Sequence, residues 1–341
     1  MALTIKENYP LKKHNTFSIA VKAAVFAEYD SEEGLAEVCS LVRNGMLPRP
    51  LLHIGSGSNL LFTKDFPGTI LHSCIKTLEV MPEVKGKIPV KVGSGFLWDD
   101  FTAVCSERGW YGAENLTGIP GETGAATVQN IGAYGTEVKD IIHSVEAMDL
   151  ETGERKCFTN PECGYGYRKS IFKLPENKRY IVTRTTFLMS AAPVWNLSYK
   201  ALAEAFDGRT PESIQEVRQA VRSIRDSKLP DPAILGNAGS FFTNPIVPKG
   251  MAEELKASYP DIPVYGSGDP DTVKLSAGWM IDRAGWKGKS LGRAGVYGKQ
   301  ALVLVNLGGA EGNEIAALAD AVRDSVMKMF GVELHPEVNI L

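Results

Sequence analysis

Three segments in the second half of the chain carry side chains suited to proton transfer or to binding negative charge. They are GYGYRKSIFK (164–173) with Arg168, GNAGSFFTNP (236–245) with Ser240, and HPEV (335–338) with Glu337. A positioned hydroxyl or carboxyl can transfer a proton, and a guanidinium can hold an anion. Each residue also has a simpler reading, as a stacked surface arginine, a turn serine or a solvated glutamate. No Gly-x-Ser-x-Gly turn surrounds Ser240, which argues against a Ser-His-Asp hydrolase.

Two glycine-rich stretches in the first half could approach a phosphate-bearing ligand through their backbone. GSGSNLL (55–61) follows a short apolar run, and the stretch 112–135 contains IPGETGAA and QNIGAYG. The first is not a Rossmann fingerprint, because Leu60 stands where the last glycine is needed, nor a Walker loop, because no Gly-Lys-Ser/Thr follows. A plain turn is an equal alternative for it. The two stretches together favour a large cofactor held mostly by backbone hydrogen bonds.

The elements that must position these segments alternate between strand and helix, which predicts an α+β fold. A helix is expected over 31–44, with Asp30 and Glu33 capping its start, and a strand over 51–54. The stretch 112–135 shows no hydrophobic period and is expected to be loop and turn. Further strands are expected at 69–75, 90–92, 144–150 and 180–188, and a helix at 211–225.

A stiff connector, KLPDP (228–232), marks an expected domain boundary. Beyond it, a strand at 301–306 followed by a helix at 311–329 predicts a βαβ-like module.

The composition excludes several classes of protein. A net charge of −3, with 44% hydrophobic and 23% charged residues, is ordinary for a globular chain, and 341 residues predict two or three domains. Nothing indicates a surface for nucleic acid, a signal peptide or a membrane span. The five cysteines form no CxxC pair, which argues against a disulfide framework or a zinc site. We therefore expect a cytoplasmic protein with reduced thiols, no metal, and no nucleic-acid or membrane partner.

The order of the motifs resembles that of the UDP-N-acetylenolpyruvoylglucosamine reductases. From NTF (15–17) onward the chain carries GSGSNLL, ENLTGIPG, QNIGAYG, GYGYRKSIFK, KLPDP, GNAGSFFTNP, KLSAGWMID, KQALVLVN and PEV. WNLSYKAL (195–202) resembles the tyrosine loop of the longer, type I branch of that family. Two departures are Thr127, where many relatives have Pro, and Tyr297, where relatives often have His.

The resemblance implies a fold and its division. We expect a vanillyl-alcohol-oxidase (PCMH)-type FAD-binding domain of two subdomains, 1–76 and 77–227, and a C-terminal α/β substrate-binding domain, 228–329. The tail 330–341 is expected to return to the active site beside the second subdomain.

The resemblance also implies an activity. A flavin-dependent oxidoreductase would reduce UDP-N-acetylglucosamine enolpyruvate to UDP-N-acetylmuramate during peptidoglycan precursor synthesis, acting as a monomer with NADPH as hydride donor. FAD is expected to be non-covalent, because GSGSNLL contains no His or Cys. Two alternatives remain: another non-covalent flavoenzyme of this fold that acts on sugars or alcohols, or a non-catalytic FAD-binding paralogue.

The residue roles implied by the resemblance fall into three groups. Arg168 and Glu337 would stabilise an enolate, with Glu337 protonated, and Ser240 would protonate the α-carbon. The implied FAD contacts are Ser56, Gly57, Ser58, Asn59, Ile119, Gly121, Gly124, Gln129, Gly132 and Gly135. The implied substrate contacts are Tyr134, Tyr199, Arg225, Lys228, Asn244 and Gln300.

Overall fold

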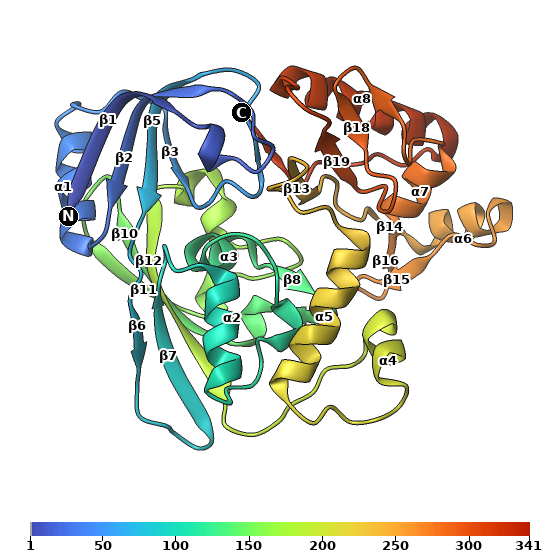
Figure 1. Cartoon of the computed structure of the whole chain (residues 1–341), viewed down its shortest axis with the longest axis horizontal. Coiled ribbons are helices and arrows are strands. Elements are labelled where there is room, and N and C mark those ends of the chain that lie inside the picture. Colours follow the sequence, from blue (N-terminus) through green and yellow to red (C-terminus); the bar gives the residue numbers. More distant parts are fainter. Residues whose placement is uncertain (1) are drawn as a thin grey trace. The chain divides into compact units, whose positions relative to one another are not determined.

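The computed structural model describes residues 2–341, which form two compact units (Figure 1). Unit 1 comprises the segment up to Tyr9 together with Ala23–Ser56 and Pro67–Arg225. Unit 2 comprises Pro10–Lys22, Gly57–Phe66 and Asp226–Leu341. The main break at 225/226 falls close to the KLPDP connector.

The units are interleaved in the sequence, which differs from the consecutive domains expected. Two short segments of the first 76 residues group with the C-terminal part of the chain, where their backbone oxygens accept hydrogen bonds from it. Asn306 Nδ2 donates to the carbonyl oxygen of Phe17 at 2.9 Å, and the Leu341 amide donates to the carbonyl oxygen of Leu61 at 2.8 Å. The C-terminal tail belongs to the same unit, where its strand β20 (Asn339–Ile340) pairs in parallel with β4 (Leu60–Leu61).

Unit 1 contains two main sheets. The first has the order β1-β2-β5-β3, from β1 (Leu3–Pro10), β2 (Lys22–Tyr29), β5 (Phe66–Ser73) and β3 (Leu51–Ile54), and its β3–β5 pair is parallel. The second has the order β11-β10-β12-β7-β6, from β11 (Arg155–Thr159), β10 (Ile142–Asp149), β12 (Tyr180–Ser190), β7 (Lys87–Gly93) and β6 (Leu78–Val80). All pairs of the second sheet are antiparallel.

Helices of unit 1 bury their apolar faces as the sequence pattern predicts. Helix α1 (Glu32–Arg43) packs Leu35, Val38 and Val42 into a core with strand residues. Its cap is Ser31, whose Oγ accepts from the Gly34 amide at 3.1 Å, so the expected Asp30 and Glu33 cap is wrong. Helix α2 (Trp98–Glu107) contributes to a second core, α4 spans Lys200–Phe206, and α5 spans Ile214–Lys228 rather than 211–225.

The stretch 112–135 is more regular than expected. It contains a 3₁₀ turn at Glu114–Leu116, helix α3 (Thr123–Gln129) and the start of a small hairpin, β8 (Gly132–Ala133) with β9 (Thr136–Glu137). Tertiary contacts hold α3 despite its weak helix formers: Thr127 Oγ1 and Thr185 Oγ1 are hydrogen-bonded at 2.8 Å. Further 3₁₀ turns of unit 1 lie at Val138–Asp140, Pro161–Cys163, Ile171–Lys173 and Pro175–Asn177.

Besides the parallel β4–β20 pair, unit 2 is built from two antiparallel sheets and three helices. One sheet has the order β13-β19-β18-β17, from β13 (Asn237–Ser240), β19 (Val303–Asn306), β18 (Ala294–Val296) and β17 (Ser290–Leu291). A second has the order β14-β16-β15, from β14 (Ile246–Pro248), β16 (Thr272–Leu275) and β15 (Val264–Gly266). The helices are α6 (Lys249–Ser258), α7 (Ala277–Arg283) and α8 (Gly312–Phe330), with a 3₁₀ turn at Lys12–His14.

The expected βαβ-like module is not formed. Helix α8 does follow β19, but β19 pairs antiparallel with both β13 and β18, and the strand after α8 pairs with β4. The helix covers this antiparallel sheet instead of crossing between parallel strands. Among residues 2–341, no helix has the length and apolar character needed to cross a membrane.

Candidate active site

In unit 1, the loop after β3 is anchored by a side-chain hydrogen bond. Ser56 Oγ donates to Glu122 Oε1 at 3.0 Å, which ties the start of GSGSNLL to the loop before α3. A Cβ atom on Gly124 would lie 2.7 Å from Ser94 Cβ, so the glycine lets α3 approach the segment that carries Ser94 closely. The structure therefore joins the two glycine-rich stretches that the sequence singled out.

Behind Ser56 lies a network of ionisable side chains. His72 Nε2 contacts Glu122 Oε1 and His72 Nδ1 contacts Glu28 Oε1, both at 3.0 Å. Burial of the ring opposes its charge, but hydrogen bonds to Cys74, Glu122 and Glu28 outweigh this and raise the pKa of His72 to about 10. At neutral pH a cationic His72 therefore lies between two carboxylates, close to the loop.

In unit 2, the remainder of the same loop is packed against the NTF motif. A Cβ atom on Gly57 (φ +71°) would lie 1.9 Å from the carbonyl oxygen of His14, so only glycine fits there. The Thr16 amide donates to the Gly57 carbonyl oxygen at 3.2 Å. Thr16 Oγ1 is buried and has no hydrogen-bond partner among the described residues.

Three non-glycine residues with left-handed backbone conformation cluster in the second glycine-rich stretch and the segment packed on it. Asn130 (φ 45°) ends α3, Tyr134 (φ 49°) lies in the hairpin turn, and Arg168 (φ 55°) lies in the 164–173 segment. Such conformations cost of order 1–3 kcal/mol each and gather at functional sites. Strain at two of the residues with expected roles, Arg168 and Tyr134, supports placing the site here.

Arg168 is held by backbone oxygens of the glycine-rich stretch. Its Nη2 donates to the Gly132 carbonyl oxygen at 3.0 Å and its Nη1 to that of Asn130 at 3.5 Å. Its guanidinium carbon lies 5.4 Å from the ring centroid of Tyr167. The guanidinium is therefore fixed at the expected cofactor loop.

Asn130, which the sequence pattern indicates only as a polar group of the cofactor loop, fixes the segment that carries Arg168. Its fully buried side chain donates from Nδ2 to the Gly166 carbonyl oxygen at 2.8 Å and to Glu137 Oε2 at 3.1 Å. Its Oδ1 accepts from the Lys139 amide at 3.1 Å. Its position in QNIGAYG, beside the predicted Gln129, was the one available signal.

The expected substrate contacts of unit 1 partly converge. The rings of Tyr134 and Tyr199 meet edge to face with centroids 5.1 Å apart. Asn115 Nδ2 bridges the carbonyl oxygens of Tyr134 and Asn196 at 2.9 and 2.8 Å, which docks the tyrosine loop on the hairpin. Arg225 lies on α5 beside Gly118, where an added Cβ would be 3.2 Å from Arg225 Nε.

Unit 2 brings Ser240, Glu337 and Asn59 together from three distant segments. Ser240 ends β13, and the carbonyl oxygen of the next residue, Phe241, accepts from the Glu337 amide at 2.8 Å. Asn59 Nδ2 donates to the Glu337 carbonyl oxygen at 3.1 Å. All three side chains are part-exposed or half-buried rather than locked in the core. Two expected catalytic residues and one expected cofactor contact thus share one backbone network.

Asn244 and Gln300 meet at the first turn of α7. Asn244 Oδ1 accepts from the Ala277 amide at 3.0 Å, and Gln300 Oε1 lies 3.2 Å from where a Cβ on Gly278 would stand. Lys228, the last residue of α5, is exposed.

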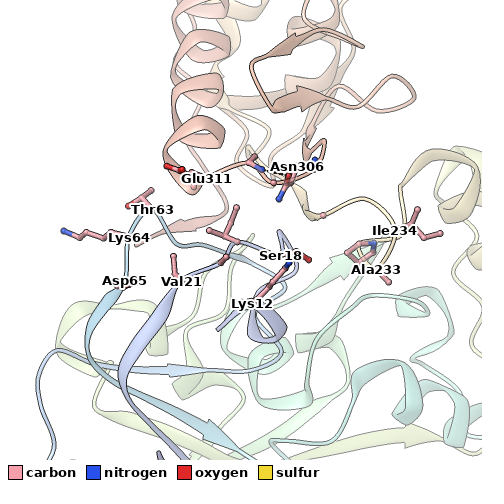
Figure 2. Close-up of a pocket in the computed structure, with 18 residues that line it drawn as sticks. Lys12, Ser18, Val21, Thr63, Lys64, Asp65, Ala233, Ile234, Asn306 and Glu311 are labelled. Carbon is pink, nitrogen blue, oxygen red and sulfur yellow. Dashed lines mark hydrogen bonds between the residues drawn. The ribbon is translucent and has the colours of Figure 1, made fainter. Parts of the chain in front are cut away.

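A cavity of about 650 Å³ within unit 2 contains none of the expected site residues (Figure 2). Lys12 and Lys64 line it together with Asp65 and Glu311, so two basic side chains are matched by two acidic ones. Asn306 shapes its wall by accepting from the Gly308 and Ala310 amides at 2.9 and 3.0 Å.

Comparison with known proteins identifies two family models and a solved structure that match the chain. The family model described as UDP-N-acetylenolpyruvoylglucosamine reductase, C-terminal domain, matches residues 231–341, and the model of an FAD binding domain matches residues 23–157. The crystal structure of UDP-N-acetylenolpyruvylglucosamine reductase from Thermus caldophilus has a similar fold, with a TM-score of 0.68 at 24% identity over 100% of this chain and 99% of that one. This confirms the expected fold class.

Curated relatives match over their whole length. UDP-N-acetylenolpyruvoylglucosamine reductase of Bacteroides fragilis (strain YCH46) is 52% identical over 99% of this chain and 100% of its own. The Porphyromonas gingivalis enzyme is 43% identical with the same coverage, and the Pseudomonas aeruginosa enzyme 41% identical over 100% of both chains. The chain therefore belongs to the UDP-N-acetylenolpyruvoylglucosamine reductase family.

Proposed function

We propose that this protein reduces UDP-N-acetylglucosamine enolpyruvate to UDP-N-acetylmuramate, with NADPH as hydride donor and FAD as cofactor, in peptidoglycan precursor synthesis. The observation that carries the proposal is the Ser240–Phe241–Glu337 connection, which puts a hydroxyl and a carboxyl on one rigid backbone network in a chain of this family.

The residues present fit FAD. Thr16, whose amide donates to the Gly57 carbonyl oxygen, has a buried Oγ1 without a partner among the described residues. Gly57 has no room for a side chain because of the His14 backbone. Glu122, the carboxylate that binds Ser56, is neutralised by His72, so it does not repel a diphosphate. We propose that Ser56, Gly57, Ser58 and Asn59 hold the diphosphate non-covalently, and that the rest of the cofactor lies along Ile119, Gly121, Gly124, Gln129, Gly132 and Gly135.

FAD, when bound, supplies a relay that carries hydride from NADPH to the vinyl carbon of the enolpyruvyl group. The protein must then stabilise negative charge on the substrate carboxylate and protonate the α-carbon. Arg168 supplies a full positive charge, and Glu337 is the second polar group proposed to stabilise this intermediate. Ser240 transfers the proton to the α-carbon, and Lys228 and Asn244 shape its surroundings.

The remaining polar residues suit the nucleotide part of the substrate. Tyr134 and Tyr199, already in edge-to-face contact, and Arg225 offer hydroxyl and guanidinium donors for a diphosphate, with Gln300 as a further donor.

Ser240→Ala tests the assignment through separate half-reactions. The variant should bind FAD and be reduced by NADPH at the wild-type rate, because the hydroxyl is not needed there. Its reoxidation by the enolpyruvyl sugar nucleotide should slow by about 10²–10⁴-fold, the usual contribution of a positioned proton donor. Reoxidation at the wild-type rate would show that Ser240 is not the proton donor.

We also propose that the protein acts as a cytoplasmic monomer. Five free cysteines and a requirement for NADPH and a nucleotide sugar support the location. Light scattering coupled to size exclusion tests the monomer, since a mass near 74 kDa, about twice the 37.0 kDa of one chain, would contradict it.

A further inference from the structure

Three side chains from unit 1 meet on one face of its first sheet. Glu28 lies on β2, His72 on the adjacent strand β5, and Cys74 directly after β5. His72 and Cys74 are two residues apart and so point to the same side of an extended chain. The Cys74 amide donates to the Tyr29 carbonyl oxygen at 2.6 Å, which fixes Cys74 beside β2. The cluster therefore stands on a hydrogen-bonded scaffold rather than on a loose loop.

The distances between the three potential ligand atoms match a coordination sphere. His72 Nδ1 lies 3.0 Å from Glu28 Oε1 and 3.8 Å from Cys74 Sγ, and Cys74 Sγ lies 3.9 Å from Glu28 Oε1. Tetrahedral Zn²⁺, with bonds of about 2.0–2.3 Å, places such atoms roughly 3.3–3.6 Å apart. An ion can therefore be accommodated with shifts of a few tenths of an ångström.

The surroundings of the cluster also match those of a metal site. His72 contacts Glu122 Oε1 through its other nitrogen, Nε2, at 3.0 Å, which is the carboxylate–histidine arrangement that orients metal-bound imidazoles. The fully buried ring of Phe26 lies beside His72, with centroids 6.1 Å apart. The side chains of His72 and Glu28 remain 13% and 23% exposed, which leaves an entry path and an open coordination position.

We propose that Glu28, His72 and Cys74 form a binding site for one thiophilic divalent cation of the Zn²⁺ type. Binding displaces one proton from His72 Nδ1 and one from the Cys74 thiol, and the net charge of the site with Glu122 stays the same. Because Glu122 also accepts from Ser56 Oγ, an ion at this site would stiffen the start of the cofactor loop. The sequence pattern does not indicate this site, because Glu28, His72 and Cys74 do not follow a known metal-binding spacing.

Equilibrium dialysis of the chelator-treated flavoprotein against micromolar Zn²⁺ tests the site. We expect one ion per wild-type chain, binding at least tenfold weaker in Cys74→Ser, and wild-type binding in the matched control Cys157→Ser, which changes an exposed cysteine. Glu122→Gln should weaken binding by about 10- to 100-fold, as loss of a histidine-orienting carboxylate does.

Cobalt gives an independent readout of the thiolate ligand. Adding Co²⁺ to the wild-type flavoprotein should produce a near-ultraviolet sulfur-to-cobalt band in the difference spectrum, and Cys74→Ser should lack it. Bound Zn²⁺ should also protect one thiol from Ellman's reagent. Less than stoichiometric Zn²⁺, or Zn²⁺ bound equally by Cys74→Ser, would overturn the proposal and leave Glu28, His72 and Glu122 as an ion-pair network only.

Discussion

Replacing Asn130 with alanine should damage both the stability of unit 1 and the step that depends on Arg168. The side chain is fully buried and makes three hydrogen bonds, to the Gly166 carbonyl oxygen, to Glu137 Oε2 and from the Lys139 amide. Gly166 belongs to the segment that carries Arg168, so the change releases the backbone beneath the guanidinium.

The cost follows from these contacts. Bonds to the two neutral backbone groups are worth about 1 kcal/mol each, and the bond to a carboxylate about 1.5–3 kcal/mol. Holding alanine at φ 45° costs about 1 kcal/mol more. We therefore expect the free energy of unfolding to fall by about 4–6 kcal/mol in Asn130→Ala. In Asn130→Gly the fall should be about 1 kcal/mol smaller, because glycine tolerates that conformation.

Denaturant unfolding and stopped-flow reoxidation measure the two effects. We expect reoxidation by the enolpyruvyl substrate to slow by about 10²-fold, as a displacement of about 1 Å does, while reduction by NADPH changes little. Asn306→Ala is the matched control, because Asn306 also makes three hydrogen bonds but none of them goes to the segment that carries Arg168.

The control should lose similar stability and keep a reoxidation rate close to wild type. Equal slowing in both variants would mean that destabilisation alone explains the kinetics. A stable Asn130→Ala protein with normal reoxidation would refute the positioning role altogether.

Three further predictions concern a glycine, a histidine and a tyrosine. Gly57→Ala should lose FAD and at least about 2 kcal/mol of stability, because its Cβ would meet the His14 carbonyl oxygen at 1.9 Å. The control Gly45→Ala, also at positive φ but with no atom near the added Cβ, should cost only about 1 kcal/mol. Thermal unfolding measures both losses. Burial, with a smaller effect from the charge of His72, lowers the pKa of His53 from 6.5 to about 3. Between these two pH values the unfolded chain binds a proton at His53 that the folded protein does not bind. The free energy of unfolding should then fall by up to about 1.4 kcal/mol per pH unit between pH 6.5 and 3, and His53→Gln should remove this slope; an unchanged slope would exclude His53. Tyr199→Ala should raise KM for the sugar nucleotide about tenfold with kcat nearly unchanged, and a fall in kcat alone would contradict a binding role.

Local patterns predicted the elements that bury a periodic apolar face. The strand over 51–54 was correct at both ends, and the helix over 31–44 was nearly so, because Leu35, Val38 and Val42 recur at helical spacing. Helix α3 escaped prediction because six of its seven residues are small or β-branched and its support comes from Thr185 and from close packing on Ser94.

Features that depend on distant contacts could not be read from one sequence. The motif order brought Ser240 and Glu337 into one site by resemblance, and the structure adds the Phe241 carbonyl that connects them. The role of Asn130 depends on a contact with the distant Gly166 segment, and Glu28 meets His72 and Cys74 only once β2 and β5 pair. The interleaving of the two units is of the same kind, since it accompanies contacts between distant segments, such as the hydrogen bond from Asn306 to Phe17.

A visible-absorption titration of the purified protein tests the central claim most directly. We predict an oxidised flavin spectrum that bleaches with NADPH under anaerobic conditions and returns when UDP-N-acetylglucosamine enolpyruvate is added, with one UDP-N-acetylmuramate formed per flavin. A colourless protein that binds no FAD, or a reduced flavin that the enolpyruvyl sugar nucleotide does not reoxidise, would contradict it.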